Sequence, residues 1–306
     1  MKNTPNISPA FLKQGDKIAI TATARKVSKE EVLPAITIFK SWGLNVVVND
    51  DLFLSENQFA GVDEIRARNF QNYIDDPSIK AVFCARGGYG TVRIIDQLNF
   101  HSFASNSKWI VGYSDITVLH SHIHTHTNVV TVHATMPINM QPHNADEESI
   151  YSLRKILFGE NTSYQIPAHQ LNKIGEAKGK LIGGNLSVLY SLLGSNSDIN
   201  TAGKILFLED LDEYLYHIDR MMMNLKRTNK LSNLSGLIIG AMSDMKDNTI
   251  PFGQTAEEVI YSHIKEFNYP VCFNFQAGHE KRNLALKFGA EVLLKTSKDS
   301  SQLSFL

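Results

Sequence analysis

Three separate segments of the chain each place a residue used in nucleophilic catalysis at the end of an expected strand. Ser114 follows the apolar run Trp109–Gly112 and precedes a helix expected to start near Asp115. A serine at a strand–turn–helix junction stands clear of the sheet edge, as a nucleophile must. The helix start offers free N–H groups that stabilise negative charge on an attacked carbonyl oxygen. Ile116 replaces the second glycine of the usual G-x-S-x-G motif, so a simple helix N-cap is the alternative for Ser114.

A base and an orienting acid are available further along the chain. His279 comes shortly after the expected strand Val271–Phe273, and Glu209 directly follows the expected strand Ile205–Leu208. Serine, acid and histidine occur in this chain order in one group of hydrolases. The residues therefore predict a triad of Ser114, Glu209 and His279 in a crevice between two domains. The alternative for the acidic run Glu209–Glu213 is a charged first turn that favours the following helix.

A glycine-rich segment, Arg86-Gly87-Gly88-Tyr89-Gly90, ends another expected strand. Glycines at a strand end let the backbone approach a ligand closely. The segment lacks both G-x-G-x-x-G and G-K-[ST], which disfavours a nucleotide site. An oxyanion donor and a plain tight turn both remain as interpretations of this loop.

Four histidines at alternate positions, His120 to His126, form i,i+4 pairs with metal-ligand spacing. No carboxylate or cysteine lies between His120 and His133 to complete a metal site, so we expect a packed or solvated helix face. A metal hydrolase using this run is kept as a rival interpretation. Cys84 and Cys272 are too few for a disulfide framework and are expected to be buried packing residues.

Composition excludes several classes of protein. The 306 residues carry a net charge of −1, which argues against a general nucleic-acid binder. No stretch approaches the roughly 20 apolar residues of a membrane span. The segment Met1–Asp16 has no apolar core, so we expect that it is not a signal peptide and that the protein is cytoplasmic.

The elements that must position these residues alternate between strands and helices, which predicts α/β architecture with a mostly parallel N-terminal sheet. Ligands bind beyond the carboxyl ends of parallel strands, so Arg86–Gly90 and Ser114 should open on one edge. The expected strands are 17–21, 44–48, 81–84, 109–112, 205–208, 237–239, 271–273, 285–288 and 291–294, and the expected helices are 28–41, 62–74, 91–98, 186–193 and 214–226, with another from about 115. For the first helix, Ser28 is the expected N-cap, with Glu31 three residues on.

We expect an N-terminal nucleophile domain over residues 1–140, a linker over 141–177 and a C-terminal domain over 178–306 that supplies the acid and the histidine. The second half is richer in strands near its end, which predicts a smaller α/β domain with a mixed or barrel-like sheet.

These residues together resemble the LD-carboxypeptidase family of serine peptidases, which includes muramoyltetrapeptide carboxypeptidases and microcin C immunity peptidases. The matching segments span nearly the whole chain in family order. They are Phe59–Arg66 (FAGVDEIR), Ala81–Gly90 (AVFCARGGYG), Val111–Thr117 (VGYSDIT), Lys180–Ser187 (KLIGGNLS), Leu206–Met222 (LFLEDLDEYLYHIDRMM) and Ala277–His279 (AGH).

The resemblance implies Ser114 as nucleophile, His279 as general base and Glu209 as the orienting acid, with an oxyanion hole made by the N–H groups of Gly88 and Asp115. It also implies a flavodoxin- or Rossmann-like N-terminal domain, a homodimer, no metal and no cofactor. The implied reaction is release of the terminal D-alanine from murein tetrapeptide during cell-wall recycling in the cytoplasm. The partner is thus a small muropeptide, with no nucleic acid and no membrane.

Exopeptidase action also requires recognition of a free carboxylate. Arg86 is the sequence candidate for that contact, and Gly87 and Tyr89 are grouped with it as substrate-binding residues; a structural ion pair is the alternative for Arg86. Two segments depart from the family pattern, Thr21–Thr23 and His133–Met136, and both are candidates for the pocket lining. The rival functions are an immunity-type peptidase that cleaves an aminoacyl-adenylate amide and a non-catalytic two-domain protein that binds a small ligand.

Overall fold

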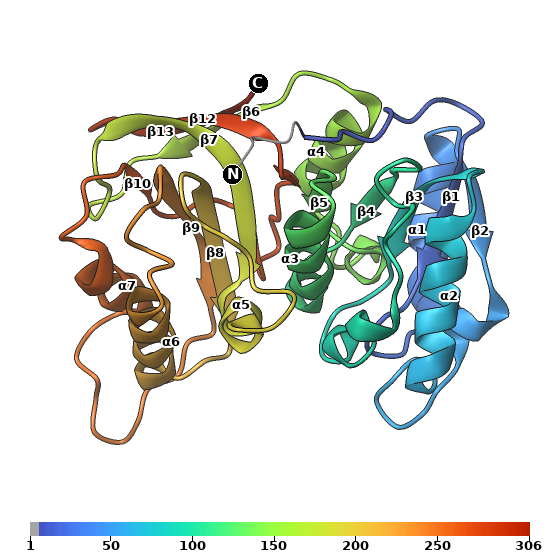
Figure 1. The fold of residues 1–306 in the computed structure, drawn as a ribbon, viewed down its shortest axis with the longest axis horizontal. Helices are drawn as coiled ribbons and strands as arrows, with labels where there is room; N and C mark the ends of the chain where they lie inside the picture. The colour runs from blue at the N-terminus through green and yellow to red at the C-terminus, as the bar shows by residue number, and fades with distance from the viewer. Residues whose placement is uncertain (1–5) are drawn as a thin grey trace.

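The computed structural model describes residues 6–306, so the first five residues of Met1–Asp16, the segment expected not to be a signal peptide, lie outside the described part. Two lobes, each built around one sheet, stand side by side (Figure 1). The blue-to-green lobe holds the N-terminal half and the yellow-to-red lobe the C-terminal half. Among the described residues, no helix is both long and apolar enough to cross a membrane.

The N-terminal lobe contains a six-stranded sheet in the order β11-β5-β4-β3-β1-β2. Its strands are β1 (Lys17–Thr21), β2 (Asn45–Val48), β3 (Ile79–Cys84), β4 (Trp109–Val111), β5 (Thr131–His133) and β11 (Leu286–Phe288). All pairings among β1 to β5 are parallel, and only β11 is antiparallel. The predicted α/β class with a mostly parallel N-terminal sheet is therefore confirmed.

Helices and short 3₁₀ turns connect these strands. They are α1 (Lys29–Ser41), η1 (Asp50–Phe53), α2 (Asp63–Asp75), η2 (Thr91–Arg93), η3 (Ile95–Gln97), η4 (Ser114–Ile116), α3 (Thr117–His126), η5 (Pro137–Met140) and α4 (Glu147–Phe158). The predicted start of α1 is confirmed, because Ser28 and Glu31 form a reciprocal capping box.

The helix predicted over 91–98 is wrong, since that segment forms only the 3₁₀ turns η2 and η3. The run contains four β-branched residues, which weakens its helix preference. The N–H of Thr91 donates to the buried Asp115 carboxylate at 2.8 Å, which fixes the start of the segment in place.

The C-terminal lobe contains a seven-stranded sheet in the order β10-β9-β8-β7-β12-β13-β6. Its strands are β6 (Ser163–Pro167), β7 (Gly175–Asn185), β8 (Ile205–Leu211), β9 (Gly236–Ser243), β10 (Val271–Cys272), β12 (Glu291–Thr296) and β13 (Ser300–Phe305), and its helices are α5 (Leu186–Leu192), α6 (Leu215–Arg227) and α7 (Ala256–Ile264). Pairing is parallel from β10 to β7 and antiparallel from β7 to β6, so the predicted mixed sheet is confirmed.

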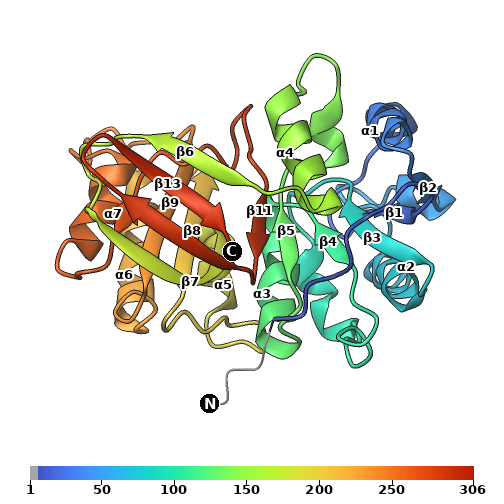
Figure 2. The ribbon, with the colours of Figure 1, turned by 90° about the horizontal axis from the view of Figure 1, so that it is seen from above.

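The two lobes exchange pieces of chain. Strand β11 leaves the C-terminal half and pairs with β5 of the other sheet, with Leu286 opposite His133 (Figure 2). The segment 141–177, predicted as a linker, contains α4 and β6, and β6 completes the far edge of the second sheet. The predicted domain limits stay a prediction, but the connection between lobes is a structured element.

Candidate active site

Ser114 occupies a strained turn at the carboxyl end of β4. Its φ is 64°, in the left-handed region that side chains other than glycine rarely adopt. The turn is tight, because a Cβ on Gly112 would lie 2.8 Å from the Ile116 side chain. Ser114 is the first residue of η4, and neither η4 nor α3 has a side-chain cap, so the N-cap interpretation is wrong. Its hydroxyl is partly exposed and makes no hydrogen bond within residues 6–306.

The glycine loop lies directly against this serine. A Cβ on Gly87 would lie 2.9 Å from the Cβ of Ser114 and 3.4 Å from the backbone N of Asp115. Gly88 has a φ of 105°, which also favours glycine. The N–H groups of Gly88 and Asp115 donate no hydrogen bond to another described residue. An oxyanion hole needs free N–H donors of this kind, and the assignment of Gly88 and Asp115 to it stays a prediction.

The Asp115 side chain ties the loop to the turn. Its carboxylate is buried and accepts the Thr91 N–H just beyond Gly90. Burial raises the pKa of Asp115, opposed by the hydrogen bonds from Thr91. The Thr91 hydroxyl is hydrogen-bonded to that of Thr23 at 2.8 Å. Asp115 thus connects the two segments, since its backbone belongs to the serine turn while its carboxylate fixes the glycine loop.

Glu209 and His279 meet across 70 residues of sequence. The carboxylate Oε2 of Glu209 lies 2.7 Å from Nδ1 of His279, and Glu209 is 0% exposed. Burial disfavours protonation of His279, but the Glu209 charge and hydrogen bond together raise the pKa of the imidazole above its ordinary value. A carboxylate on Nδ1 fixes the tautomer that leaves Nε2 free to accept a proton. The pair is therefore arranged as a base with its orienting acid.

The local backbone explains how Glu209 reaches the histidine. Strand β8 continues to Leu211, so Glu209 lies within the strand and not after it, as the sequence had indicated. The register with β9 shifts between Leu208 and Asp210, and such bulges re-aim side chains. Gly278, with a φ of 120°, leaves room for the carboxylate, because a Cβ there would lie 2.8 Å from Oε2 of Glu209.

The other acids of the run 209–213 point elsewhere. Asp210 accepts hydrogen bonds from the side-chain amide of Asn185 and the N–H of Ser187, both at 2.9 Å. Burial and the neighbouring Glu209 charge raise the pKa of Asp210 to about 7. Its role is to attach the start of α5 to β8. Asp212 pairs with Lys246 and Glu213 with His217, at 2.7 and 2.5 Å.

Contacts between the lobes hold the serine turn near this pair. The ring of Tyr113, the residue before Ser114, packs against the His279 ring with centroids 4.8 Å apart. The N–H of Asn185 donates to the Thr117 hydroxyl at 3.0 Å, which joins β7 to the start of α3. The serine turn and the acid–histidine pair therefore face each other across the lobe boundary.

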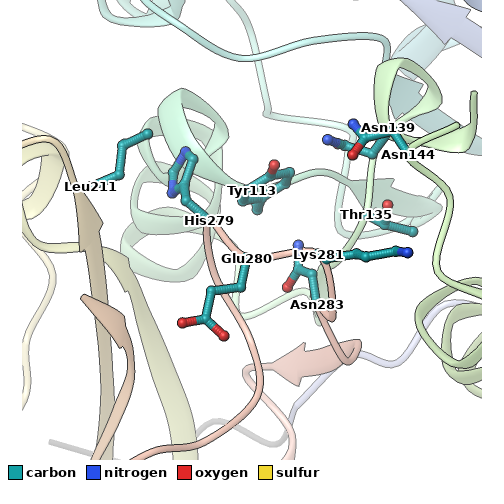
Figure 3. Close-up of a pocket in the computed structure, with 9 residues that line it drawn as sticks. All are labelled: Tyr113, Thr135, Asn139, Asn144, Leu211, His279, Glu280, Lys281 and Asn283. Atoms are coloured by element: carbon teal, nitrogen blue, oxygen red, sulfur yellow. The ribbon is translucent and has the colours of Figure 1, made fainter. Parts of the chain in front are cut away.

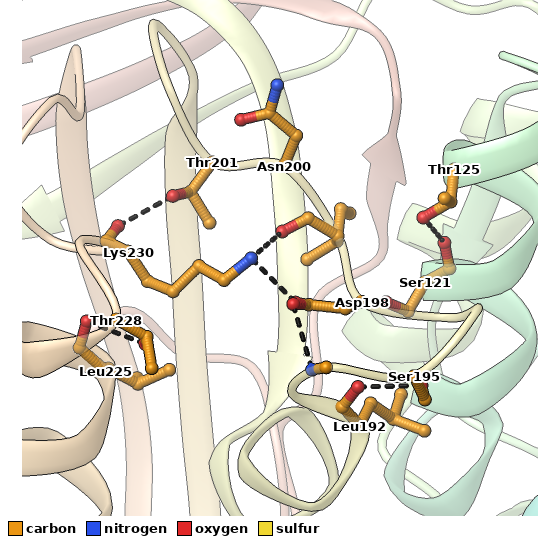
Figure 4. A network of polar contacts seen from close by, with 12 residues as sticks. Ser121, Thr125, Leu192, Ser195, Asp198, Asn200, Thr201, Leu225, Thr228 and Lys230 are labelled. Atoms are coloured by element: carbon orange, nitrogen blue, oxygen red, sulfur yellow. Dashed lines mark hydrogen bonds and ion pairs between the residues drawn. The ribbon is translucent and has the colours of Figure 1, made fainter.

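A second set of contacts lies further along α3 (Figure 4). The Ser121 hydroxyl donates to the carbonyl of Ser197 at 2.6 Å, across the boundary. The loop carrying Ser197 is itself anchored, because Lys230 pairs with Asp198 at 2.6 Å and donates to the Ile199 carbonyl. The helix behind Ser114 is thereby fixed to the lobe that carries the histidine.

The histidine run faces the interior and the lobe boundary. His120 bonds the Thr131 hydroxyl and the Gly112 carbonyl, at 2.8 and 2.9 Å, and burial lowers the pKa of His120 to about 4. His124 shares the Thr131 hydroxyl, and His126 bonds the carbonyl of Asn196. The expectation of a packed helix face is confirmed for His120 and His124. No cluster of three or more metal-ligating side chains occurs within the described chain.

A cavity of about 290 Å³ opens beside the histidine (Figure 3). Its lining residues are Tyr113, Thr135, Asn139, Asn144, Leu211, His279, Glu280, Lys281 and Asn283. Of the two departing segments, His133–Met136 contributes Thr135, whereas Thr21–Thr23 does not line this cavity. Sequence inspection missed Lys281 and Asn283, although their position two and four residues after His279 was an available signal.

The predicted substrate-binding residues lie outside this cavity. Arg86 forms an ion pair with Glu31 at 3.7 Å, and both side chains are partly exposed. Tyr89 is half exposed and lies beside the Phe59 ring, with centroids 6.2 Å apart. Gly87 packs against the serine turn. Their roles in binding substrate stay predictions.

Comparison with known proteins agrees with this geometry. Residues 18–134 match the model of the LD-carboxypeptidase N-terminal domain, and residues 178–294 match that of the C-terminal domain. The chain is 32% identical to a probable murein peptide carboxypeptidase of Bacillus subtilis, over 97% of this chain and 94% of that protein. The chain therefore belongs to the LD-carboxypeptidase family of serine peptidases, as the sequence resemblance indicated.

Two solved structures show the same two-lobed fold. The muramoyltetrapeptide carboxypeptidase from Oxalobacter formigenes is 26% identical, with a TM-score of 0.86 over 94% of this chain and 98% of that one. An MccF-like protein from Bacillus anthracis is 23% identical, with a TM-score of 0.85 over 98% and 99% of the two chains. The second likeness concerns the fold alone.

Proposed function

We propose that this protein is a serine carboxypeptidase that releases the terminal D-alanine from murein tetrapeptide, with Ser114, Glu209 and His279 as its triad. The observation that carries the proposal is the buried Glu209–His279 hydrogen bond, which lies across the lobe boundary from a serine in a strained turn. The murein substrates named for the Bacillus and Oxalobacter relatives support the choice of peptide.

In the proposed reaction, Nε2 of His279 accepts the Ser114 proton while Oγ attacks the amide carbonyl carbon. The resulting oxyanion accepts hydrogen bonds from the N–H groups of Gly88 and Asp115. Glu209 stabilises the imidazolium, which then donates its proton to the leaving nitrogen as the C–N bond breaks. D-Alanine departs, and a water molecule, deprotonated by His279, hydrolyses the acyl-enzyme and restores the Ser114 hydroxyl.

The proposal includes a cytoplasmic homodimer that needs no metal and no cofactor. A small muropeptide fits a site whose adjoining cavity measures about 290 Å³, which is the size of a pocket for a small ligand and not for a folded partner. Light scattering on the purified chain tests the dimer, and full activity in a chelator tests the independence from metal.

The decisive experiment follows the loss of one alanine from murein tetrapeptide by mass spectrometry. Ser114→Ala should reduce turnover to background while its thermal unfolding stays close to that of the parent. Ser191→Ala, on the exposed face of α5, is the matched control and should retain full activity. Alanine release by Ser114→Ala at the parental rate would refute the assignment of the nucleophile.

The immunity-type activity is the second candidate, and it uses the same triad. The fold likeness to the MccF-like protein, with a TM-score of 0.85, is nearly as close as that to the murein enzyme. An aminoacyl sulfamoyl adenosine offered in the same assay separates the two functions. Faster cleavage of that compound than of murein tetrapeptide would favour the immunity-type activity.

A further inference from the structure

The cavity beside His279 lies where the departing residue of a substrate must sit. In the proposed reaction the imidazole gives its proton to the leaving nitrogen, so the leaving residue must be next to His279. His279 itself lines the cavity, together with Tyr113, whose ring packs on it. For a carboxypeptidase, the leaving residue carries the free C-terminal carboxylate. The lining of this cavity should therefore contain groups suited to a carboxylate.

Asn283 supplies an unused donor at this position. Its side chain is only 3% exposed, and its Oδ1 accepts the N–H of Gly278 at 3.0 Å. This contact orients the amide, so that Nδ2 is the atom left over. Nδ2 is buried and has no hydrogen-bond partner among residues 6–306. Buried amide donors are nearly always paired, so this one points to an acceptor supplied from outside the chain.

Lys281 supplies an unpaired positive charge on the same loop. It lines the cavity, and no ion pair or hydrogen bond of its ammonium group occurs within the described chain. The neighbouring cation is already used, because Arg282 pairs with Glu148 at 2.9 Å and approaches Asp146 at 3.9 Å. Lys281 is therefore the cation of this loop that is available to a ligand.

The surrounding groups favour an anion at this end of the cavity. Figure 3 shows the Lys281 side chain running toward Thr135, while the Glu280 carboxylate points the opposite way. The amides of Asn139 and Asn144 lie on the far side of Thr135. Apart from Glu280, every polar side chain of this lining can donate a hydrogen bond, which suits a carboxylate.

The loop is held rigidly enough to define a subsite. The N–H of Asn283 donates to the Ser149 hydroxyl at 2.8 Å, and that hydroxyl donates to Asp146 at 2.7 Å. Helix α4 and its N-cap therefore anchor the two residues that directly follow Lys281, Arg282 and Asn283. An anchored loop backbone loses less entropy than a mobile one when its donors bind a carboxylate.

We propose that this cavity binds the C-terminal residue of the substrate, with Lys281 and the Nδ2 group of Asn283 holding its free carboxylate. This inference rests on the proposed function and identifies how that site restricts cleavage to the chain end. It assigns the carboxylate contact to Lys281 in place of Arg86, whose guanidinium is paired with Glu31 outside the cavity. Lys281 acts in binding and takes no part in bond breaking.

The test compares two substrates that differ only at the proposed contact: murein tetrapeptide and the same peptide ending in D-alaninamide. The parent enzyme should prefer the free acid by about 10- to 150-fold in kcat/KM, the range for a hydrogen bond to a charged group. Lys281→Met should remove most of that preference by raising the KM for the free acid. It should leave kcat/KM for the amide substrate within about twofold of the parent value. Lys281→Arg should restore the preference for the free acid. Lys298→Met, in the exposed turn after β12, is the charge-matched control and should behave as the parent.

Binding gives a readout that does not depend on turnover. The same two peptides are titrated calorimetrically into Ser114→Ala and into Ser114→Ala/Lys281→Met. Turnover by the parent together with an undiminished preference for the free acid in Lys281→Met would overturn the subsite and leave the proposed function standing. If the parent does not turn over murein tetrapeptide, but Ser114→Ala binds the free acid more tightly than the amide and Lys281→Met abolishes that preference, the proposed function would be overturned and the subsite supported.

Discussion

Replacing Glu209 by glutamine is the sharpest perturbation of the proposed triad, because it keeps the shape of the side chain and removes its charge. The carboxylate bonds the imidazole at 2.7 Å and is fully buried. Opposite charges centred about 4 Å apart interact by about 4 kcal/mol at an effective dielectric constant of about 20. Loss of that energy when the imidazolium forms corresponds to a decrease of about 10³-fold in kcat.

The same substitution should move the pH profile. The Glu209 charge and hydrogen bond outweigh burial and raise the pKa of His279, so activity should increase as the pH rises through that value and the free base appears. With Glu209→Gln, burial is opposed by the Asp210 charge, which is the smallest of the effects on the His279 pKa, so the acid limb should shift to lower pH while the plateau falls. Kinetics of D-alanine release across the pH range measure both effects.

Asp210 provides the matched control, since it is the adjacent residue and an equally buried carboxylate. Asp210 faces Asn185 and Ser187, and not the histidine. Asp210→Asn should therefore keep kcat within about tenfold of the parent value. Its acid limb should shift less than that of Glu209→Gln. Equal kinetic losses in the two variants, or a Glu209→Gln enzyme within tenfold of the parent, would refute the reasoning.

Three further outcomes are expected. Gly278→Ala should lower kcat at least about tenfold and reduce stability, because its Cβ would lie 2.8 Å from Oε2 of Glu209. Burial holds the pKa of His133 well below its ordinary value. Unfolding exposes an imidazole that binds a proton below about pH 6.5, so the free energy of unfolding decreases as the pH is lowered. Urea titrations should show that, between about pH 7.5 and 5.5, the free energy of unfolding of the parent decreases by about 1.4 kcal/mol more than that of His133→Phe. Burial raises the pKa of the Cys84 thiol to about 12 and that of Cys272 to about 11, so a thiol reagent should label neither until denaturant is added.

The first two of these outcomes have controls in the chain. Gly194→Ala introduces a Cβ at a φ of 78° with no atom within 4 Å, so it separates backbone strain from crowding and should leave kcat unchanged. His143→Phe changes an exposed histidine and should retain the pH dependence of the parent. Labelling of either cysteine in the native protein would contradict the burial on which that prediction depends.

The sequence by itself determined the fold class, most of the elements and the three candidate groups. Strand and helix periods, together with signals such as the capping of α1 by Ser28, are local and can be seen in short windows. Ser114 and His279 were found because the types of residue at strand ends carry information even before the strands are assembled.

Only the tertiary structure decided which groups meet. The sequence selected Glu209 for its position after the expected strand, but the bulged register of β8 on β9 is what turns Glu209 toward His279 and Asp210 toward α5. The segment 91–98 forms two 3₁₀ turns, and the N–H of Thr91 at its start donates to the carboxylate of Asp115 from another element. Strand β11 pairs with β5 across the lobe boundary, and α4 anchors the loop with Lys281 and Asn283. These arrangements depend on contacts between residues distant in sequence, whose energies no short window of the chain contains.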